Sequence, residues 1–298
     1  MNPETLKFDI CLYHNNCADG TGAAYPFWRI HSGNDNFRLL PVDYDKPWPK
    51  CIKNKNVVIV DFSYKRDKLF KMSKICKSIL ILDHHKSAEE NLTGIDKELD
   101  NVSYIFDMNK SGAQISWNYC YPGIDTPWFI EYIADRDLWK WELKNSKEIN
   151  KAMFIGNWYN FEKLEELYIQ SESKELLINK FIEQGNLLLN YEKILINNAI
   201  NCAVKCKFEG YVVLLTTCDY SIKSEVGNIL SNLDGIDFSA TWTYIYNTNE
   251  WRISLRGGNN CDIPLHKIAE KFGGGGHPRS CGFTLRDDIH KYFKVIEE

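Results

Sequence analysis

The stretch ILILDHHKSA (residues 79–88) runs from four consecutive apolar residues directly into an aspartate and two histidines. Apolar residues without polar alternation are typical of a strand that is covered on both faces, as in a parallel sheet. The stretch NVVIVDF (residues 56–62) has the same form, and the segment between the two is charged and helical in pattern. This alternation predicts an α/β fold with a doubly wound, mainly parallel sheet.

The length and patterning of the chain predict two domains. Its 298 residues exceed the commonest size of a single domain. Residues 112–201 are mainly helical in pattern, and a second series of strand and helix patterns begins near Cys202. We therefore expect an α/β domain with a helical insert at residues 1–185, a linker helix at 186–201 and a smaller α/β domain at 202–298.

The composition excludes several classes of protein. A net charge of −4 and a pI near 6.0 argue against a protein that coats long nucleic acid. No apolar run approaches the roughly 20 residues of a membrane span. The beginning, MNPETLKFDICLYHNN, lacks the basic and apolar regions of a secretory signal, so we expect a cytoplasmic protein with reduced cysteines. No CxxC pair is present, which argues against a structural zinc module.

Three further aspartates lie in settings like that of Asp83. Asp19 is in the turn HNNCADGTG, Asp61 closes VVIVD, and Asp135 is in FIEYIADRDLW. Each alone could be a turn former, a strand-end residue or a solvated helix charge. In open α/β sheets, however, ligands bind beyond the carboxyl ends of the strands, where these groups would gather.

Crowded carboxylates and imidazoles would repel one another unless divalent cations neutralised them. Mixed oxygen and nitrogen ligands suit Mn²⁺, Fe²⁺, Co²⁺ or Zn²⁺ better than Ca²⁺. Pairs of such ions are the usual means of hydrolysing phosphate esters. The sequence therefore predicts a metal site.

These motifs together resemble the DHH phosphoesterase superfamily. The resemblance rests on HxxxxDG at residues 14–20, Asp61 at a strand end, DHH at 83–85 and the pair Ala134–Asp135. The second half agrees, because SLRG and then IAEKFGGGGHPRSCGF look like the DHHA1 substrate-binding domain. Ordered motifs in two domains are more specific than any single glycine-rich stretch.

The resemblance implies a binuclear Mn²⁺ site, in which Mg²⁺, Co²⁺ or Zn²⁺ could substitute. Asp61 would bridge the two ions. Asp19, His84 and Asp135 would complete the ligands of one ion, and His14 would bind the other.

The resemblance also implies roles for the other two residues of the DHH motif. Asp83 would be a supporting catalytic carboxylate that orients a histidine. His85 would contact the scissile phosphate or transfer a proton to the leaving group. Two neighbouring positions stay open. Cys17 stands where many members have an aspartate, and it could bind a soft ion or be a spectator. Asp137 is as well explained by a surface ion pair as by a ligand role.

The glycine run at residues 273–276 gives the backbone freedom to approach a ligand closely. His277 and Arg279 follow it, and Arg256 ends the predicted strand WRISLRG, so an anion site is expected there. A flexible loop beside an unrelated histidine is the alternative. The expected substrate-binding residues are Arg256, Gly274, Gly275, Gly276, His277 and Arg279.

The activity implied by the resemblance is that of a phosphodiesterase similar to bacterial nanoRNases. Such an enzyme would release mononucleotides from short oligonucleotides or from linear or cyclic dinucleotides. A pyrophosphatase or polyphosphatase is an alternative on the same catalytic domain. A non-catalytic nucleotide sensor is a third possibility, because Cys17 could leave the metal pair incomplete. The sequence leaves open whether the chain forms a homodimer.

Overall fold

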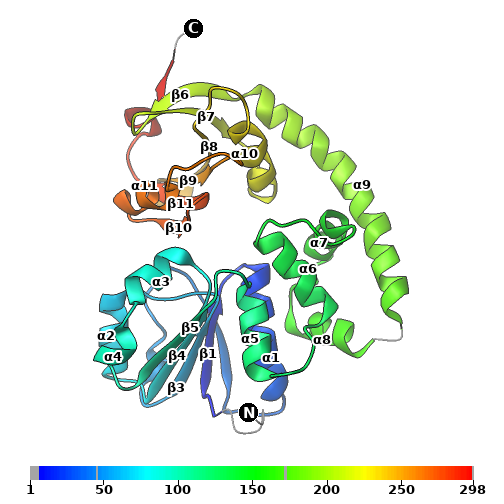
Figure 1. Cartoon of the computed structure of the whole chain (residues 1–298), viewed down its shortest axis with the longest axis vertical. Coiled ribbons are helices and arrows are strands. Elements are labelled where there is room, and N and C mark those ends of the chain that lie inside the picture. The colour runs from blue at the N-terminus through cyan, green and yellow to red at the C-terminus, as the bar shows by residue number, and fades with distance from the viewer. Residues whose placement is uncertain (1–6, 45, 171–172, 297–298) are drawn as a thin grey trace. The chain divides into compact units, whose positions relative to one another are not determined.

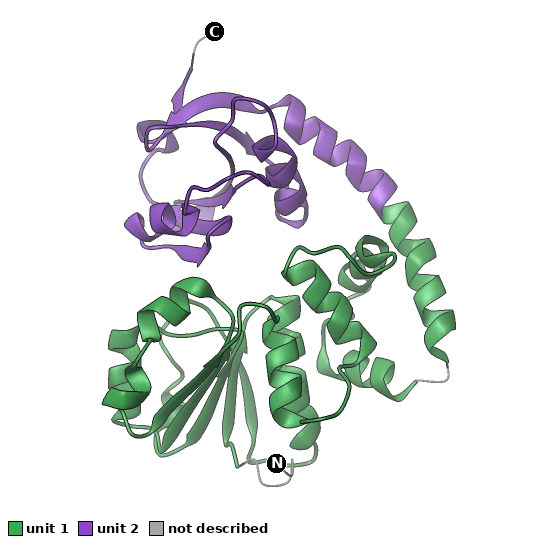
Figure 2. Ribbon diagram, in the orientation of Figure 1, with its two compact units in different colours: residues 1–188 green, residues 189–298 purple. Residues whose placement is uncertain are grey.

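The computed structural model describes residues 7–44, 46–170 and 173–296. The chain divides into two compact units, residues 1–188 and residues 189–298 (Figure 2). The division falls inside the 28-residue helix α9 (Lys174–Asn201), which therefore belongs to both units.

The N-terminal unit is built on a five-stranded sheet that is parallel throughout, with strand order β2-β1-β3-β4-β5. The predicted mainly parallel sheet is confirmed. Its strands are β1 (Ile10–His14), β2 (Arg38–Val42), β3 (Asn56–Val60), β4 (Ser78–Asp83) and β5 (Val102–Phe106). The sequence patterns predicted the three central strands, which are buried almost throughout. They did not predict the edge strands β2 and β5, whose residues alternate irregularly between exposed and buried.

Helices cover both faces of this sheet (Figure 1). On one face lie α1 (Ala18–Ile30) and α5 (Gly112–Cys120), which bury side chains such as Phe27 and Ile115 against Val58 and Leu82. On the other face lie α2 (Arg66–Ser73), α3 (Lys86–Leu92) and α4 (Ile95–Glu98). The strand order reverses between β1 and β3, and ligands of open α/β sheets bind at the carboxyl ends beside such a reversal.

A helical segment completes the N-terminal unit. It contains α6 (Trp128–Asp137), α7 (Ser146–Ile155), α8 (Phe161–Ile169) and the first part of α9. These helices share an aromatic core with Tyr25 and Trp117, in which Phe129 and Phe181 are buried. The core fixes α6 beside the sheet.

The C-terminal unit has a seven-stranded sheet of order β10-β11-β9-β8-β7-β6-β12, in which only β7 and β8 are parallel neighbours. Its strands are β6 (Val204–Phe208), β7 (Tyr211–Thr217), β8 (Phe238–Ile245), β9 (Glu250–Arg256), β10 (Gly275–His277), β11 (Ser280–Leu285) and β12 (Lys294–Val295). Helix α11 (Leu265–Lys271) packs on the main core of this unit. Helix α10 (Lys223–Ser231) packs in a separate core with the end of α9.

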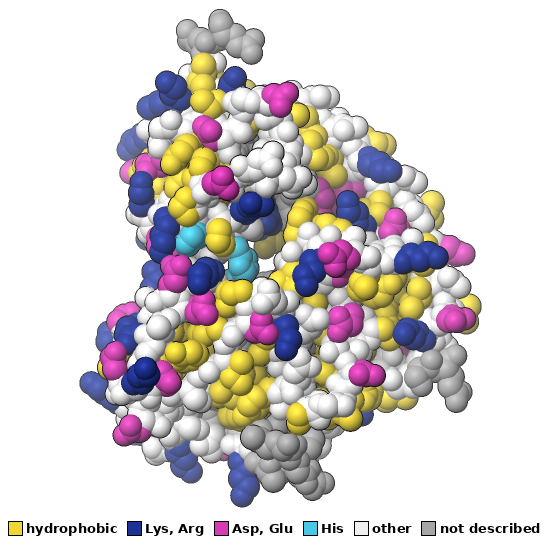
Figure 3. Space-filling model, viewed as in Figure 1, with side chains coloured by type: hydrophobic (Ala, Val, Ile, Leu, Met, Phe, Trp, Pro, Cys, Tyr) yellow, Lys and Arg dark blue, Asp and Glu magenta, His cyan; other side chains and the backbone are white. Residues whose placement is uncertain are grey.

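Short 3₁₀ turns connect several of these elements. They are η2 (Lys50–Ile52), η4 (Tyr220–Ile222), η5 (Tyr246–Thr248) and η6 (Ile289–Lys291). Among the residues that the structure describes, no helix is both long and apolar enough to cross a lipid bilayer. Basic and acidic side chains are intermixed over the face of the molecule shown in Figure 3.

The glycine run differs from the open loop that the sequence suggested. Residues Gly275–His277 form β10, an edge strand that pairs with β11. A Cβ on Gly274 would lie 2.0 Å from the carbonyl oxygen of Gly282, so glycine is needed for close packing. The N–H of Gly274 donates to the carbonyl of Ala269 at 2.9 Å. That amide is therefore committed to the fold and is not available to bind an anion.

Candidate metal centre

The ends of the central strands bring the predicted acids and histidines together. His14 is the last residue of β1, Asp61 follows β3, and Asp83 ends β4 directly before His84. The N–H of Asp61 donates to the carbonyl of Leu82 at 2.9 Å, and the residue has a φ of 51°. A positive φ is unfavourable for a residue other than glycine, and such strain gathers at functional sites.

The carboxylate of Asp61 faces two imidazoles with different oxygens. Oδ1 lies 3.2 Å from Nε2 of His84, and Oδ2 lies 3.4 Å from Nδ1 of His14. The Asp61 side chain is 2% exposed, so these neighbours, rather than water, surround it. A carboxylate that presents one oxygen to each side has the geometry needed to bridge two cations.

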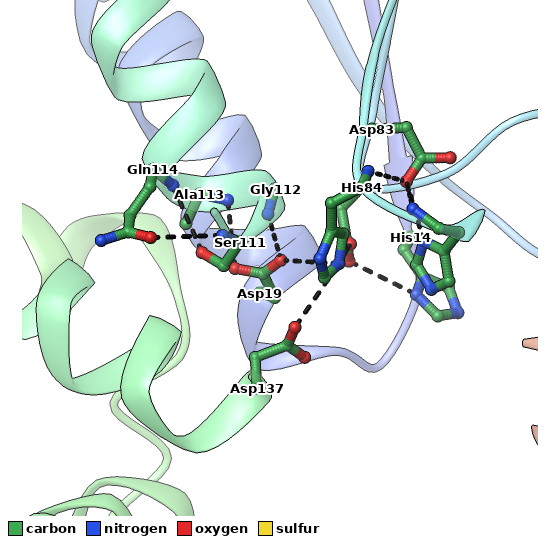
Figure 4. Close-up of polar contacts among 11 residues, drawn as sticks. His14, Asp19, Asp83, His84, Ser111, Gly112, Ala113, Gln114 and Asp137 are labelled. Carbon is green, nitrogen blue, oxygen red and sulfur yellow. Dashed lines mark hydrogen bonds and ion pairs between the residues drawn. The ribbon is translucent and has the colours of Figure 1, made fainter. Parts of the chain in front are cut away.

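One group of possible ligands lies on the Oδ1 side of Asp61. Ligand atoms of Asp19, His84 and Asp137 lie within 4.8 Å of one another. Nε2 of His84 is 3.6 Å from Oδ2 of Asp19 and 3.4 Å from Oδ2 of Asp137 (Figure 4). Asp19 and His84 are almost fully buried, whereas the Asp137 side chain is 28% exposed. Buried acids around a histidine are uncommon unless they serve a charge partner.

The N-terminus of α5 holds Asp19 in this group. The Asp19 carboxylate accepts hydrogen bonds from the backbone N–H of Gly112 at 2.6 Å and of Ala113 at 3.0 Å (Figure 4). Ser111 caps the same helix through a capping box. A Cβ on Gly112 would lie 2.6 Å from Cβ of Asp61, so a side chain there would displace the site.

A second group lies on the Oδ2 side of Asp61. Ligand atoms of His14, Cys17 and Asp61 lie within 4.8 Å of one another. Nδ1 of His14 and Oδ2 of Asp61 are buried, and neither atom makes a hydrogen bond within the described residues. Buried polar atoms are normally satisfied by a partner. The unsatisfied atoms and the nitrogen, oxygen and sulfur donors therefore fit a bound cation.

The charges of these groups are unbalanced without a cation. Burial, followed by the charges of Asp61 and Asp137, raises the pKa of Asp19 well above its usual value. Burial alone would lower the pKa of His84, but the surrounding carboxylates raise it. Burial alone would raise the pKa of Asp61, but close contacts with His14 and His84 lower it. Divalent cations would compensate this crowding of negative charge.

Asp83 is directed at His85 and at the backbone of the DHH motif. The Asp83 side chain is fully buried. Its Oδ1 lies 2.7 Å from Nδ1 of His85 and accepts the backbone N–H of His84 at 2.8 Å. Burial alone would lower the pKa of His85, but the Asp83 charge raises it. The contact fixes the orientation of the His85 ring.

Asp135 is the predicted metal ligand that the structure leaves outside both groups. Its Oδ1 accepts the N–H of Glu142 at 2.9 Å. Positions two residues apart on a helix point about 200° apart, so Asp135 and Asp137 cannot face the same site. Asp137 follows the buried Ile133 by one helical turn. That spacing is a signal in the sequence that favours Asp137.

The sequence analysis also missed Tyr44, which follows the unpredicted edge strand β2. Its ring centre lies 5.3 Å from that of His14 and 6.3 Å from that of His85. The residue is 46% exposed, so it lies at the rim of the site. Recognition of β2 as a strand would have placed Tyr44 at the carboxyl end of the sheet.

The predicted residues of the C-terminal unit cluster on β9, β10 and the turn before β11. His277 pairs with Ser280, which pairs in turn with Arg256, so these side chains share one face of the sheet. Nη2 of Arg256 donates to Oγ of Ser224 at 2.7 Å. Nε of Arg279 donates to the carbonyl of Cys261 at 3.2 Å. The Arg256 guanidinium and the His277 imidazole therefore lie on one face of the sheet, and the Arg279 guanidinium is held at Cys261.

Comparison with known sequences finds a family for the C-terminal unit and relatives that align with most of the chain. Residues 211–298 match the DHHA1 domain family. The chain is 32% identical over 306 aligned residues to the uncharacterized protein R106 of Acanthamoeba polyphaga mimivirus, covering 94% of this chain and 68% of that protein. It is 26% identical over 231 residues to oligoribonuclease NrnB of Bacillus subtilis, covering 72% of this chain and 55% of NrnB.

Solved structures share the fold at low sequence identity. A DHH domain from a member of the s1p family of ribosomal proteins matches with a TM-score of 0.55 and 14% identity, covering 97% of this chain and 83% of that one. An exopolyphosphatase-related protein from Bacteroides fragilis matches with a TM-score of 0.51 and 14% identity, covering 96% and 89%. With its DHH motif, its parallel sheet and its DHHA1 match, the chain belongs to the DHH phosphoesterase superfamily.

Proposed function

We propose that this protein is a divalent-metal-dependent phosphodiesterase that hydrolyses short oligonucleotides or dinucleotides to mononucleotides. Membership of the superfamily supports the reaction class, which is hydrolysis of phosphoester bonds. The observation that carries the proposal is the position of Asp61, whose two carboxylate oxygens face two separate groups of donors. Similarity to an oligoribonuclease supports the substrate class.

The proposed ligands of the first ion are Asp19, His84, Asp137 and Oδ1 of Asp61. Those of the second ion are His14 and Oδ2 of Asp61, and we return to Cys17 below. Two Mn²⁺ ions, or Mg²⁺, Co²⁺ or Zn²⁺ in their place, would supply Lewis acidity to the phosphate and to the attacking water.

The protein itself would contribute proton transfer through His85. Because Asp83 contacts Nδ1 of the ring, Nε2 is the atom that would give a proton to the leaving oxygen. The buried carboxylate of Asp83 stabilises the protonated imidazole, and it acts as a positioning residue. We do not assign Asp135 a ligand role, since its carboxylate holds the backbone at Glu142.

The C-terminal unit would bind a phosphate of the substrate. Arg256 is suited to this role because it projects from a strand and its guanidinium is oriented by Ser224. His277 and Arg279 would add charge beside the edge strand, in which Gly275 and Gly276 carry no side chain. In this proposal residues 1–185 are the catalytic domain, 186–201 the linker and 202–298 the substrate-binding domain.

The test is hydrolysis of the linear dinucleotide pApA by the full-length protein with Mn²⁺, beside a cyclic dinucleotide, inorganic pyrophosphate and polyphosphate. We expect AMP from pApA, and no AMP when EDTA is present. Asp61→Asn keeps the side chain's shape and should abolish turnover while the circular dichroism spectrum stays unchanged. Hydrolysis of pyrophosphate alone would overturn the proposal. Binding of pApA without cleavage in Mn²⁺, Co²⁺ or Mg²⁺ would instead indicate a nucleotide sensor.

A further inference from the structure

The two donor groups around Asp61 differ in their chemistry. The first contains the carboxylates of Asp19 and Asp137, the imidazole of His84 and one oxygen of Asp61. It is rich in oxygen, which suits Mn²⁺ and Mg²⁺. The second contains one imidazole, one carboxylate oxygen and the sulfur of Cys17. We propose that Cys17 is a metal ligand, and that this second position prefers a thiophilic ion such as Zn²⁺ or Co²⁺ over Mn²⁺.

The backbone brings the sulfur of Cys17 to this position. Cys17 is the N-cap residue of α1, with an extended backbone at φ −120° and ψ 134°. An N-cap side chain is usually a hydroxyl, carboxylate or amide, and here a thiol takes its place. The sulfur lies within 4.8 Å of ligand atoms of His14 and Asp61. A thiol at a helix cap is thus part of a three-donor group.

The unsatisfied atoms beside Cys17 point independently to a ligand. Nδ1 of His14 and Oδ2 of Asp61 are buried, 3.4 Å apart, and without a hydrogen bond among the described residues. The Asp61 side chain is 2% exposed, so water does not reach it freely. A cation bound to both atoms would satisfy them, and the thiol would release its proton to water on binding.

This inference rests on the two-ion site of the proposed function and adds a difference between its two positions. The protein would then work with unlike ions, because soft sulfur ligands select zinc and cobalt while oxygen ligands select manganese. The alternative is that Cys17 is a partly buried thiol that packs without binding a metal.

Cobalt spectroscopy distinguishes these alternatives without measuring activity. Metal-free, full-length protein is titrated with Co²⁺, and the near-ultraviolet absorption band of sulfur-to-cobalt charge transfer is followed. We expect the band in the natural protein and its loss in Cys17→Ser. The matched control is Cys202→Ser, which removes an exposed cysteine outside the site and should leave the band unchanged.

Competition between metals supplies the second measurement. Zn²⁺ and Mn²⁺ affinities are determined for the natural protein and for Cys17→Asp, in which a carboxylate replaces the thiol. We expect the preference for Zn²⁺ over Mn²⁺ to fall by about tenfold or more in Cys17→Asp. Circular dichroism of each variant checks that it folds.

A titration without the charge-transfer band, or a band that survives in Cys17→Ser, would overturn the inference. Its failure is distinguishable from failure of the proposed function. Hydrolysis of pApA by a protein without the band would refute only the role of Cys17. A band in a protein that cleaves no phosphodiester would refute only the proposed function.

Discussion

Oδ1 of Asp83 lies 2.7 Å from Nδ1 of His85, and the same oxygen accepts the backbone N–H of His84. One buried carboxylate therefore fixes a side chain and the backbone that carries the neighbouring imidazole. This makes the DHH motif a rigid unit in which Asp83 positions the two histidines.

Asp83→Asn should lower kcat for pApA by about a hundredfold or more, because the protonated form of His85 loses its stabilising charge. The Asp83 charge raises the pKa of His85. Without that charge His85 should lose its proton at lower pH, so the fall in kcat on the alkaline side of the pH profile should begin at lower pH. The pH profile of kcat measures both effects. When His85→Ala is already present, adding Asp83→Asn should lower kcat little further. A full additional loss of kcat would contradict the inference that Asp83 acts through His85.

Asp137→Asn and Asp135→Ala should have opposite consequences. Asp137→Asn should weaken binding of Mn²⁺ by about tenfold to a hundredfold, with little change in the free energy of unfolding. Asp135→Ala should leave Mn²⁺ affinity nearly unchanged but destabilise the fold by about 1–3 kcal/mol, since the N–H of Glu142 loses its acceptor. Metal titration and urea unfolding of both variants test the pair. The reverse pattern would restore Asp135 as the ligand.

Gly112→Ala should disturb the metal centre, because its Cβ would lie 2.6 Å from Cβ of Asp61 and 2.9 Å from Oδ2 of Asp19. We expect lower Mn²⁺ affinity together with a loss of stability of about 1–3 kcal/mol. The control is Gly94→Ala, whose φ of 80° makes alanine unfavourable but whose Cβ would meet nothing within 4 Å. That variant should be destabilised with unchanged Mn²⁺ affinity. If Mn²⁺ affinity fell equally in Gly112→Ala and Gly94→Ala, the loss of stability alone would explain the effect.

Binding of Mn²⁺ should release protons. The raised pKa values of His84, Asp19 and Asp137 favour their protonated forms in the metal-free protein, so a cation competes with protons for these groups. Affinity should therefore rise with pH and fall as pH is lowered. Titration calorimetry in buffers of different ionisation enthalpy should detect on the order of one proton or more per ion at neutral pH. Proton-free binding would be incompatible with the ligands proposed here.

Arg256→Gln should raise KM for pApA by about tenfold or more and leave kcat and Mn²⁺ affinity nearly unchanged, because the residue would bind phosphate away from the reacting bond. Arg252→Gln is the control, since Arg252 is an exposed arginine of the same strand. Steady-state kinetics of the two variants decide between phosphate binding and a general effect of positive charge. A fall in kcat at constant KM would contradict the assigned role.

The central strands, and the gathering of acids and histidines at their ends, were predictable from the sequence. Continuous apolar runs identified β3 and β4, because burial on both faces leaves no place for polar residues. The edge strands were not predictable in this way, since each pairs with a single neighbouring strand and carries exposed residues. The glycine run looked like a loop because the close approach of Gly274 to Gly282 depends on pairing with β11, which a run of glycines does not reveal.

The differences between the expected and the observed arrangement of the site have similar causes. The choice between Asp135 and Asp137 depends on which face of α6 is turned toward the site. Matching an Ala-Asp pair to a family motif does not show which face that is. The division of the Asp61 oxygens between His14 and His84 depends on the unusual φ of Asp61, which no local sequence rule predicts. Tyr44 was missed because its strand was missed.

Asp61 and the donors around it come from the ends of three strands, from the start of α1 and from the last residue of α6. They span the chain from His14 to Asp137, and five packed elements position them. During synthesis the donors of the first ion would therefore be complete only after α6 has left the ribosome and docked, whereas His14, Cys17 and Asp61 all precede it in the chain. Binding of the first ion would then indicate that the N-terminal unit has folded.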